Sequence, residues 1–384
     1  MKKLIIMFCV FLCFIIRVSV QEDLAPQAKS AILIDFSSGE VLYEKNADEG
    51  LPPASMTKIM SMLLIMEAID NGSLSYDDEI TISKEAASMG GSQIFLQEGE
   101  IYKVSELLKG IAIASGNDAV VAMAEKIGGT VGGFVEMMNS RAKSLGLQNS
   151  NFVNPHGLDA DNHYSSARDM AIIARELLKH EKILDYTSIY EEYLTKNDGS
   201  KTWLVNTNKL VRFFHGADGL KTGYTQSAGY CLTATAKKND LRLISVVMNE
   251  ETINNRSEDT VRLLNYGFNT YKNNIIMDKD SPLGKVKVEK GKIDSVDLVL
   301  INPATKLLKI NESIENYSFN LLVNHVVAPQ RKGDIVGQVE LIDNEGNVIN
   351  TYDVTVNENV DKANFWDYFK RNLKISLGGK ITVR

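Results

Sequence analysis

The chain has 384 residues, of which 44% are hydrophobic and 24% are charged, as in a soluble globular protein. Its length exceeds what one ordinary hydrophobic core serves, so we expect one large domain and one smaller domain. The net charge of −7 provides no general attraction to phosphate groups, and we expect no nucleic-acid partner.

The first twenty residues differ in composition from the rest of the chain. Lys2 and Lys3 precede the apolar run 4–16, and residues 18–20 precede the polar Gln21. This order is typical of a secretory signal peptide, so we expect residues 1–20 to direct export and to be removed. An uncleaved membrane anchor is the alternative, but about 13 apolar residues are short compared with the roughly 20 that span a bilayer.

Cysteine placement excludes disulfides from the mature chain. Cys9 and Cys13 fall in the signal segment, which leaves Cys231 alone without an intramolecular partner. Cys231 lies in the apolar run 230–236, which favours a small buried thiol over a nucleophile.

The mature chain opens with two β-type runs, 31–36 and 40–44, separated by a Ser-Ser-Gly turn that predicts a hairpin. The next run, 57–69, is apolar on nearly every side, which predicts a buried helix. Further helices are expected at 105–113 and 118–127, with a break between them at Ser115-Gly116-Asn117.

A capping box at Ser166-Ala167-Arg168-Asp169 predicts the start of another helix. Strands follow at 219–225, 229–236 and 241–248, and then a helix from about 258 to 271. Strands at both ends with helices between them imply one sheet built from the two ends of the domain. We therefore predict an α+β domain over residues 25–275.

The pattern changes to short alternating runs from residue 281, which predicts a small all-β domain over 281–360. Its expected strands lie at 285–288, 295–301, 318–323, 335–342 and 348–356.

Segment 361–384 is amphipathic, with apolar residues at helical spacing among basic ones. This pattern favours a helix that lies flat on a membrane surface, and a terminal helix docked on its own domain is the alternative. The apolar residues are Phe365, Trp366, Phe369 and Leu373, and the basic ones are Lys362, Lys370, Arg371 and Lys374.

Ser55 and Lys58 stand at the start of the buried helix, just after Pro52-Pro53. A spacing of three places both side chains on one helix face. A serine hydroxyl is a weak nucleophile, and a lysine whose pKa is lowered by burial can act as its base. The spacing alone is a weak signal, since a helix cap with a solvated lysine has the same pattern.

Two more triplets follow in order. Ser115-Gly116-Asn117 falls at the expected helix break, where a hydroxyl and an amide can point into a cleft. Lys221-Thr222-Gly223 falls on an expected strand, where Lys221 can pair with a carboxylate, Thr222 can hydrogen-bond it and Gly223 lets a substrate backbone approach. The three signatures together are those of penicillin-binding proteins and serine β-lactamases.

The chain resembles the low-molecular-weight penicillin-binding proteins that are D-alanyl-D-alanine carboxypeptidases. The resemblance covers roughly residues 25–275, and the later segments match the family in architecture more than in residues. Its motifs are Pro53-Ala54-Ser55-Met56-Thr57-Lys58, Ile113-Ala114-Ser115-Gly116-Asn117-Asp118-Ala119, Asn154-Pro155-His156-Gly157-Leu158-Asp159, Tyr164-Ser165-Ser166-Ala167-Arg168-Asp169 and Asp218-Gly219-Leu220-Lys221-Thr222-Gly223-Tyr224-Thr225.

This resemblance implies the fold, the reaction and the role of each site residue. The fold is a penicillin-binding protein or serine β-lactamase-like α+β catalytic domain followed by a small all-β domain. The penultimate D-alanine of a peptidoglycan stem acylates Ser55, the terminal D-alanine leaves, and water cleaves the acyl-enzyme. Lys58 is the expected base and Ser115 a proton relay. The expected substrate-binding residues are Asn117, Lys221, Thr222, Gly223 and Tyr224, with the backbone N–H groups of Ser55 and Tyr224 as the oxyanion hole.

The same resemblance implies β-lactams as covalent inhibitors and a peripheral position at the extracytoplasmic face of the bacterial cell membrane. No cofactor is expected, and the five histidines show no zinc-peptidase pattern. For His156 a loop hydrogen bond is favoured over catalysis, and for Arg168 and Arg256 a structural role is favoured over carboxylate binding.

Three alternatives remain beside the carboxypeptidase. A D,D-endopeptidase acting on cross-links uses identical chemistry, and the motifs do not separate the two. A β-lactamase needs an extra carboxylate-held water, and the nearest match to the required segment, Glu136 to Asn139, lies inside an expected helix. A non-catalytic binder of cell wall or β-lactam would need no proton relay.

Overall fold

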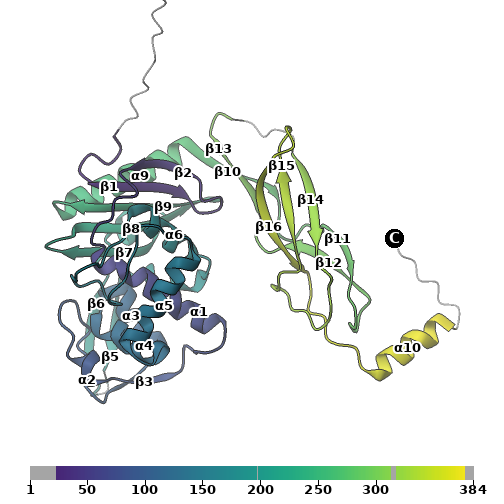
Figure 1. Cartoon of the computed structure of the whole chain (residues 1–384), viewed down its shortest axis with the longest axis horizontal. Coiled ribbons are helices and arrows are strands. Elements are labelled where there is room, and N and C mark those ends of the chain that lie inside the picture. The colour runs from purple at the N-terminus through teal and green to yellow at the C-terminus, as the bar shows by residue number, and fades with distance from the viewer. Residues whose placement is uncertain (1–22, 197, 313–316, 377–384) are drawn as a thin grey trace, which may run out of the picture.

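The structure is a computed structural model that describes residues 23–196, 198–312 and 317–376. The expected signal peptide, residues 1–20, lies outside the described residues. A first domain of helices around a sheet leads into a second, β-rich domain, and a helix follows it (Figure 1). The α+β class predicted for the first domain is confirmed, as is the all-β character of the second.

One antiparallel five-stranded sheet in the order β2-β1-β9-β8-β7 organises the first domain. Side chains of successive strand residues point to opposite faces, so Ile32 and Ile34 enter one hydrophobic core while Ala31 and Leu33 enter the other. Both ends of the domain supply strands, as predicted. The strands are β1 (Ser30–Asp35), β2 (Val41–Lys45), β7 (Ala217–Thr225), β8 (Gly229–Lys238) and β9 (Leu241–Glu250).

Helices cover both faces of this sheet. Helix α9 (Ile253–Thr270) packs on β8 and β9, and α6 (Ala167–Leu177) packs on β1 and β9. The remaining elements of the domain form the helical part beside α6: η1 (Ala54–Thr57), α1 (Lys58–Asp70), β3 (Glu79–Thr81), α2 (Lys84–Ala87), β4 (Ile101–Lys103), α3 (Val104–Ala114), α4 (Asn117–Gly128), α5 (Val131–Ser144), η2 (Glu181–Ile183), α7 (Leu184–Thr187), β5 (Glu191–Thr195), β6 (Lys201–Val205) and α8 (Leu210–Phe213).

Helix α1 is buried on almost all sides, as its continuous apolar sequence predicts. Helix α6 begins at the predicted cap, where the Ser166 side chain accepts a hydrogen bond from the backbone N–H of Asp169. The carboxylate of Asp169 does not complete the box. It accepts hydrogen bonds from the Asn149 backbone and the Ser150 hydroxyl instead, which fastens the loop after α5 to α6.

The second domain contains a five-stranded antiparallel sheet in the order β11-β12-β16-β15-β14 and the pair β10-β13. Because β10 pairs with β13, this domain begins at Tyr271, directly after α9, and not near residue 281 as the apolar alternation suggested. The polar pair Asn273-Asn274 interrupts that alternation. The strands are β10 (Tyr271–Met277), β11 (Gly284–Lys287), β12 (Ser295–Leu300), β13 (Ala304–Lys309), β14 (Ser318–Val323), β15 (Gly337–Ile342) and β16 (Val348–Val356).

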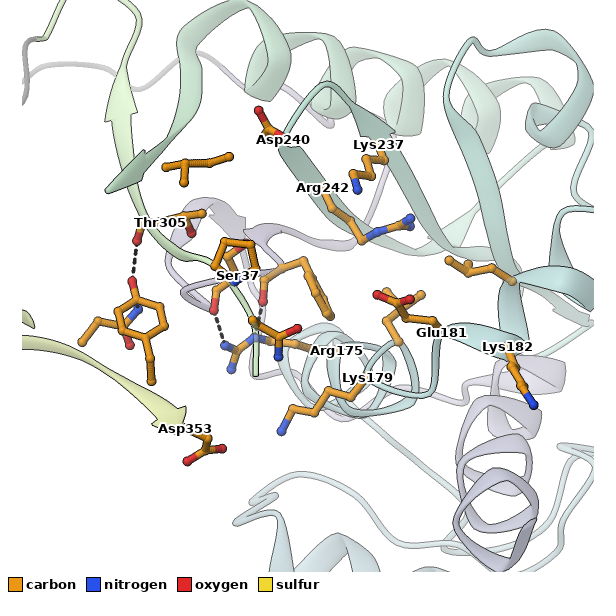
Figure 2. Close-up of a pocket in the computed structure, with 18 of the residues that line it drawn as sticks. Ser37, Arg175, Lys179, Glu181, Lys182, Lys237, Asp240, Arg242, Thr305 and Asp353 are labelled. Atoms are coloured by element: carbon orange, nitrogen blue, oxygen red, sulfur yellow. Dashed lines mark hydrogen bonds between the residues drawn. The ribbon is translucent and has the colours of Figure 1, made fainter. Parts of the chain in front are cut away.

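A cavity of about 750 Å³ lies between the two domains, on the side of α6 and η2, and residues of both domains line it (Figure 2). Arg175 lies in its wall and donates hydrogen bonds to the carbonyl oxygens of Phe36 and Ser37. Asn273 joins the domains beside it, with Nδ2 within 3.2 Å of the Asp240 carbonyl oxygen. Ser55 and Lys58 do not line this cavity.

Helix α10 (Phe365–Ser376) follows the second domain and lies far from the first domain (Figure 1). Within the described part of the chain, every helix is too short or too polar to cross a bilayer.

Candidate active site

Ser55 lies in the short 3-10 turn η1, three residues before Lys58, the first residue of α1. The two side chains meet as predicted, with Lys58 Nζ 3.0 Å from Ser55 Oγ. The preceding residue, Ala54, has a φ of +47°, a conformation that costs energy for a residue with a Cβ. The backbone at the nucleophile is therefore held in an unusual shape.

Lys58 is completely buried, and two other oxygen atoms surround its amine. Nζ donates to Asn117 Oδ1 at 2.6 Å and to the backbone carbonyl of His156 at 2.7 Å. Burial, and then the charge of Lys221, hold the pKa of Lys58 well below its usual range, against an opposing effect of Asp118. When this amine is neutral, its two N–H groups donate to Asn117 Oδ1 and to the His156 carbonyl oxygen. Its lone pair is then available to accept the proton of the Ser55 hydroxyl.

Ser115 and Asn117 flank the break between α3 and α4. Ser115 adopts the left-handed conformation with a φ of +64°, and among the described residues its buried Oγ has no hydrogen-bond partner. A buried hydroxyl without a partner calls for an explanation, and a role in proton transfer at this position is one. One N–H of the Asn117 amide is bound to the Gly90 carbonyl oxygen at 2.7 Å, so the other remains for a ligand.

Asp118 fastens the loop 88–98 beside this break. Its buried carboxylate accepts hydrogen bonds from the backbone N–H groups of Ile94 and Leu96, and the Asn117 N–H donates to the Ser92 carbonyl oxygen at 2.7 Å. The loop is thus tied to the same turn that carries Ser115 and Asn117.

Strand β7 brings the third triplet against the start of α1. A Cβ added to Gly223 would stand 2.6 Å from the Pro53 carbonyl oxygen and 3.2 Å from the Ser55 nitrogen, so only glycine permits this approach. The Thr222 hydroxyl donates to Thr207 Oγ1 at 2.7 Å. Thr207 adjoins the site from the end of β6, and no motif in the sequence marked it.

Lys221 is buried, and its Nζ contacts the Thr222 carbonyl oxygen at 3.1 Å. Burial, and then the charge of Arg256, lower the pKa of Lys221 to about 7. Arg256 itself is buried, and among the described residues its Nε has no hydrogen-bond partner. The charge of the neighbouring Glu250 acts on Arg256, so the structural role favoured for Arg256 stays a prediction. Arg256 also lies close enough to Lys221 for its charge to act at this end of the site.

The loop 152–163 covers the other side of η1. The ring of His156 accepts a hydrogen bond from the Leu158 N–H, which agrees with its predicted role in the loop. His163, which the sequence did not single out, accepts from the Val153 N–H through Nδ1 and contacts Thr57 Oγ1 at 2.8 Å through Nε2. A Cβ on Gly157 would overlap the Ala54 carbonyl oxygen at 1.8 Å, so the loop presses on the residue before Ser55.

Other predicted residues lie as follows. Tyr224 is exposed and stacks on Tyr230 with ring centroids 4.3 Å apart. Arg168 forms ion pairs with Glu44 and Asp48, which is the structural role favoured for it. Cys231 is buried, and burial raises the pKa of its thiol to about 12, which confirms the reading as an inert thiol.

Glu136 and Asn139 lie within α5, and Asn139 holds the neighbouring loop through the backbone of Phe152. The segment that most resembles the water-holding element of a β-lactamase is thus used structurally.

Family models match both domains. A model described as D-alanyl-D-alanine carboxypeptidase matches residues 17–252. A second model, described as the C-terminal domain of penicillin-binding protein 5, matches residues 271–362.

Relatives of the same kind span most of the chain. The D-alanyl-D-alanine carboxypeptidase DacF of Bacillus subtilis (strain 168) is 47% identical over 352 residues, covering 91% of this chain and 90% of that protein. The D-alanyl-D-alanine carboxypeptidase DacA of Escherichia coli (strain K12) is 36% identical over 369 residues, covering 89% and 87%.

Solved structures agree. Penicillin binding protein 5 from Haemophilus influenzae matches with a TM-score of 0.67 and 32% identity, over 88% of this chain and 98% of that one. Penicillin-binding protein D2 from Listeria monocytogenes, in its ampicillin-bound form, matches with a TM-score of 0.57 and 33% identity, over 63% and 98%. The chain belongs to the D-alanyl-D-alanine carboxypeptidase family.

Proposed function

We propose that this protein is a serine-type D-alanyl-D-alanine carboxypeptidase that removes the terminal D-alanine from peptidoglycan stem peptides. The observation that carries the proposal is the contact of the buried Lys58 amine, whose pKa burial lowers well below its usual range, with the Ser55 hydroxyl. A base with a lowered pKa beside a serine is the arrangement that acyl transfer requires.

In the acylation step, Ser55 Oγ attacks the carbonyl carbon of the penultimate D-alanine, and its proton passes to Lys58 Nζ. Ser115, whose Oγ has no hydrogen-bond partner in the part of the chain that the structure describes, passes a proton to the nitrogen of the leaving D-alanine as the C–N bond breaks. Water then cleaves the ester and restores the Ser55 hydroxyl. The backbone N–H groups of Ser55 and Tyr224 bind the oxyanion.

The terminal carboxylate binds at the cationic end of the site. Lys221 and Thr222 contact it, and Arg256 adds a second positive charge nearby. A carboxylate restores the protonated state of Lys221, because an opposite charge favours the ammonium form. Asn117 holds the substrate amide through its second N–H group.

The test is the release of D-alanine from a peptide ending in D-alanyl-D-alanine, with and without penicillin. We expect release that penicillin blocks, a penicillin adduct on Ser55, and loss of both in Ser55→Ala. The control is Ser188→Ala, which removes a surface hydroxyl bound to the Leu184 carbonyl and leaves release unchanged. Penicillin labelling without D-alanine release points to an endopeptidase or a receptor, and retained release in Ser55→Ala refutes the proposal.

We also propose that the protein is exported and binds peripherally, through α10, to the extracytoplasmic face of the cell membrane. The signal-like residues 1–20 support export. The side chains of Phe365, Trp366 and Phe369 on α10 are 74%, 64% and 49% exposed, and an exposed apolar helix face is typical of interfacial binding.

The test of the tether is truncation after Asn364, because residues 361–363 still pair with the second domain. We expect the truncated protein to leave anionic vesicles that bind the full chain, and to keep D-alanine release. Trp366→Asp with Phe369→Asp is the matched full-length variant, and unchanged vesicle binding by both proteins contradicts the tether.

A further inference from the structure

The hairpin β5-β6 exposes two aromatic rings beside the active site. Its inner face carries Leu194 and Leu204, which are buried in the core of the first domain. On the outer face Tyr193 and Trp203 are paired directly opposite each other, and they are 60% and 58% exposed. Large aromatic side chains gathered on a surface usually mark a binding site.

The second strand of the hairpin leads to a residue that contacts the catalytic strand β7. Side chains of every second residue share a face, so Trp203 and Val205 lie on the same side of β6, which ends at Val205. The ladder extends to Asn206, whose N–H donates to the Tyr190 carbonyl oxygen, and Thr207 receives the hydrogen bond from Thr222. Thr207 lies beyond the end of β6, four residues after Trp203, so the chain between them spans at most about 13 Å at about 3.3 Å per residue.

Both ends of the hairpin are fixed. Its base is held to β7 by the contact between Thr207 and Thr222. At its tip, Lys196 Nζ donates to the Phe95 carbonyl oxygen at 2.7 Å. Phe95 belongs to the loop 88–98 that holds Asn117, so the aromatic pair stands at a set position relative to the catalytic groups. A preorganised surface of this kind loses little entropy on binding.

We propose that Tyr193 and Trp203 form a platform that stacks against a sugar ring of the peptidoglycan glycan strand. This rests on the proposed function, because it takes the polymer that carries the stem peptide as the ligand. The C–H face of a pyranose is apolar and slightly positive, which matches the electron-rich face of an aromatic ring. Polar side chains flank the pair on the same face, as the hydroxyl and acetamido groups of the sugar require: Glu191, Thr195 and Lys201.

The platform suits a sugar better than a protein partner. A stable protein interface buries about 800 Å² on each side, whereas this face offers two rings bordered by charged and hydroxyl groups. A saccharide needs no more than such a ring pair with nearby hydrogen-bonding groups.

Tryptophan fluorescence gives a direct test, because the chain has two tryptophans and the other is Trp366 on α10. In a Trp366→Phe background, Trp203 alone reports on the platform. We expect a saturable emission change with a chitin tetrasaccharide. Tyr193→Leu weakens this binding by roughly two- to tenfold, which is the range for aromatic contacts, whereas Tyr193→Phe, which keeps the ring, binds as before.

Activity on two substrates separates this inference from the proposed function. Trp203→Leu should release D-alanine from a short peptide as fast as the unchanged protein, but several-fold more slowly from soluble glycan strands that carry pentapeptide stems. Phe319→Leu, an exposed aromatic change on β14, should alter neither rate.

Two results overturn the platform: no saturable fluorescence change with the saccharide, or an equal loss on both substrates in Trp203→Leu. Absence of D-alanine release from the unchanged protein overturns the proposed function instead, and the saccharide titration still decides the platform.

Discussion

The two domains differ in what they bury. The core of the second domain consists of valine, leucine and alanine side chains, and Thr355 is the one polar residue buried among its described residues. The first domain buries many charged residues, among them Lys58, Asp118 and Lys221. Because a buried charge is costly unless it is paired, this difference shows that the first domain gives up stability where chemistry needs it.

The buried charges of the first domain fall into two kinds. Asp118 and Asp169 accept hydrogen bonds from backbone N–H groups or hydroxyls and hold loops in place. Lys58 and Lys221 have pKa values that burial lowers. The first kind builds the site, and the second kind supplies its reactivity.

Replacement of Lys58 by methionine is expected to have the largest effect. Without the base, acylation by penicillin and release of D-alanine should slow by about 10²- to 10⁴-fold. The buried volume is nearly conserved, so the protein should remain folded. The measurement is the rate of penicillin labelling at Ser55, and a loss of less than tenfold would contradict the role of Lys58 as base.

The same variant tests whether Lys58 is neutral in the fold. A lysine with a lowered native pKa binds fewer protons in the folded state than in the unfolded state. The free energy of unfolding therefore rises with pH until the unfolded lysine also loses its proton, near its ordinary pKa of 10.5. Between pH 7 and 10 the unfolding temperature of the unchanged protein should therefore rise relative to that of Lys58→Met. A constant difference would show that Lys58 stays protonated.

A core substitution in the second domain should instead lower stability and leave activity unchanged. Leu298 on β12 is buried in its core, and Leu298→Ala should destabilise that domain by about 2–5 kcal/mol without changing D-alanine release from a short peptide below the unfolding temperature. Leu322→Ala, at a 48% exposed position on β14, is the control and should change stability little. Calorimetry with activity measured on the same sample distinguishes the two outcomes.

The pH dependence of kcat/KM tests the cationic end of the site. Lys221 must be protonated to bind a carboxylate, and its pKa in the free protein is about 7. Above that pH, kcat/KM should therefore fall by about tenfold per pH unit. The fall in kcat should come at higher pH, because bound carboxylate raises the lysine pKa.

Lys221→Arg should move the alkaline limb to higher pH, since a guanidinium stays protonated. An unmoved limb in that variant would assign the ionisation to another group.

Sequence predicted the parts of the site that short motifs carry. The order of Ser55-Lys58, Ser115-Asn117 and Lys221-Gly223 places these residues on a helix start, a helix break and a strand, and the structure brings them together. The buried helix was predictable because its apolar residues occupy every side.

Sequence did not predict the contacts that depend on tertiary packing. Thr207 and His163 each reach the site through one hydrogen bond to a distant residue, and neither stands in a pattern of local spacing. The hairpin β5-β6 was missed because its strands are short and its outer face mixes aromatic, charged and hydroxyl side chains. The predicted start of the second domain lay too far along the chain because β10 is polar at Asn273 and Asn274.

Asn273 provides the smallest predicted effect and sharpens the comparison between the domains. Its Nδ2 makes long contacts of 3.3 Å to Asp35 Oδ1 and 3.2 Å to the Asp240 carbonyl oxygen, so Asn273→Ala should cost no more than about 1 kcal/mol. Calorimetry should show the unfolding transitions of the two domains moving apart, while D-alanine release from a short peptide stays unchanged. Leu307 of β13 already packs into the core of the first domain, and a loss of that release would show that the first domain also depends on the second domain to shape its cleft.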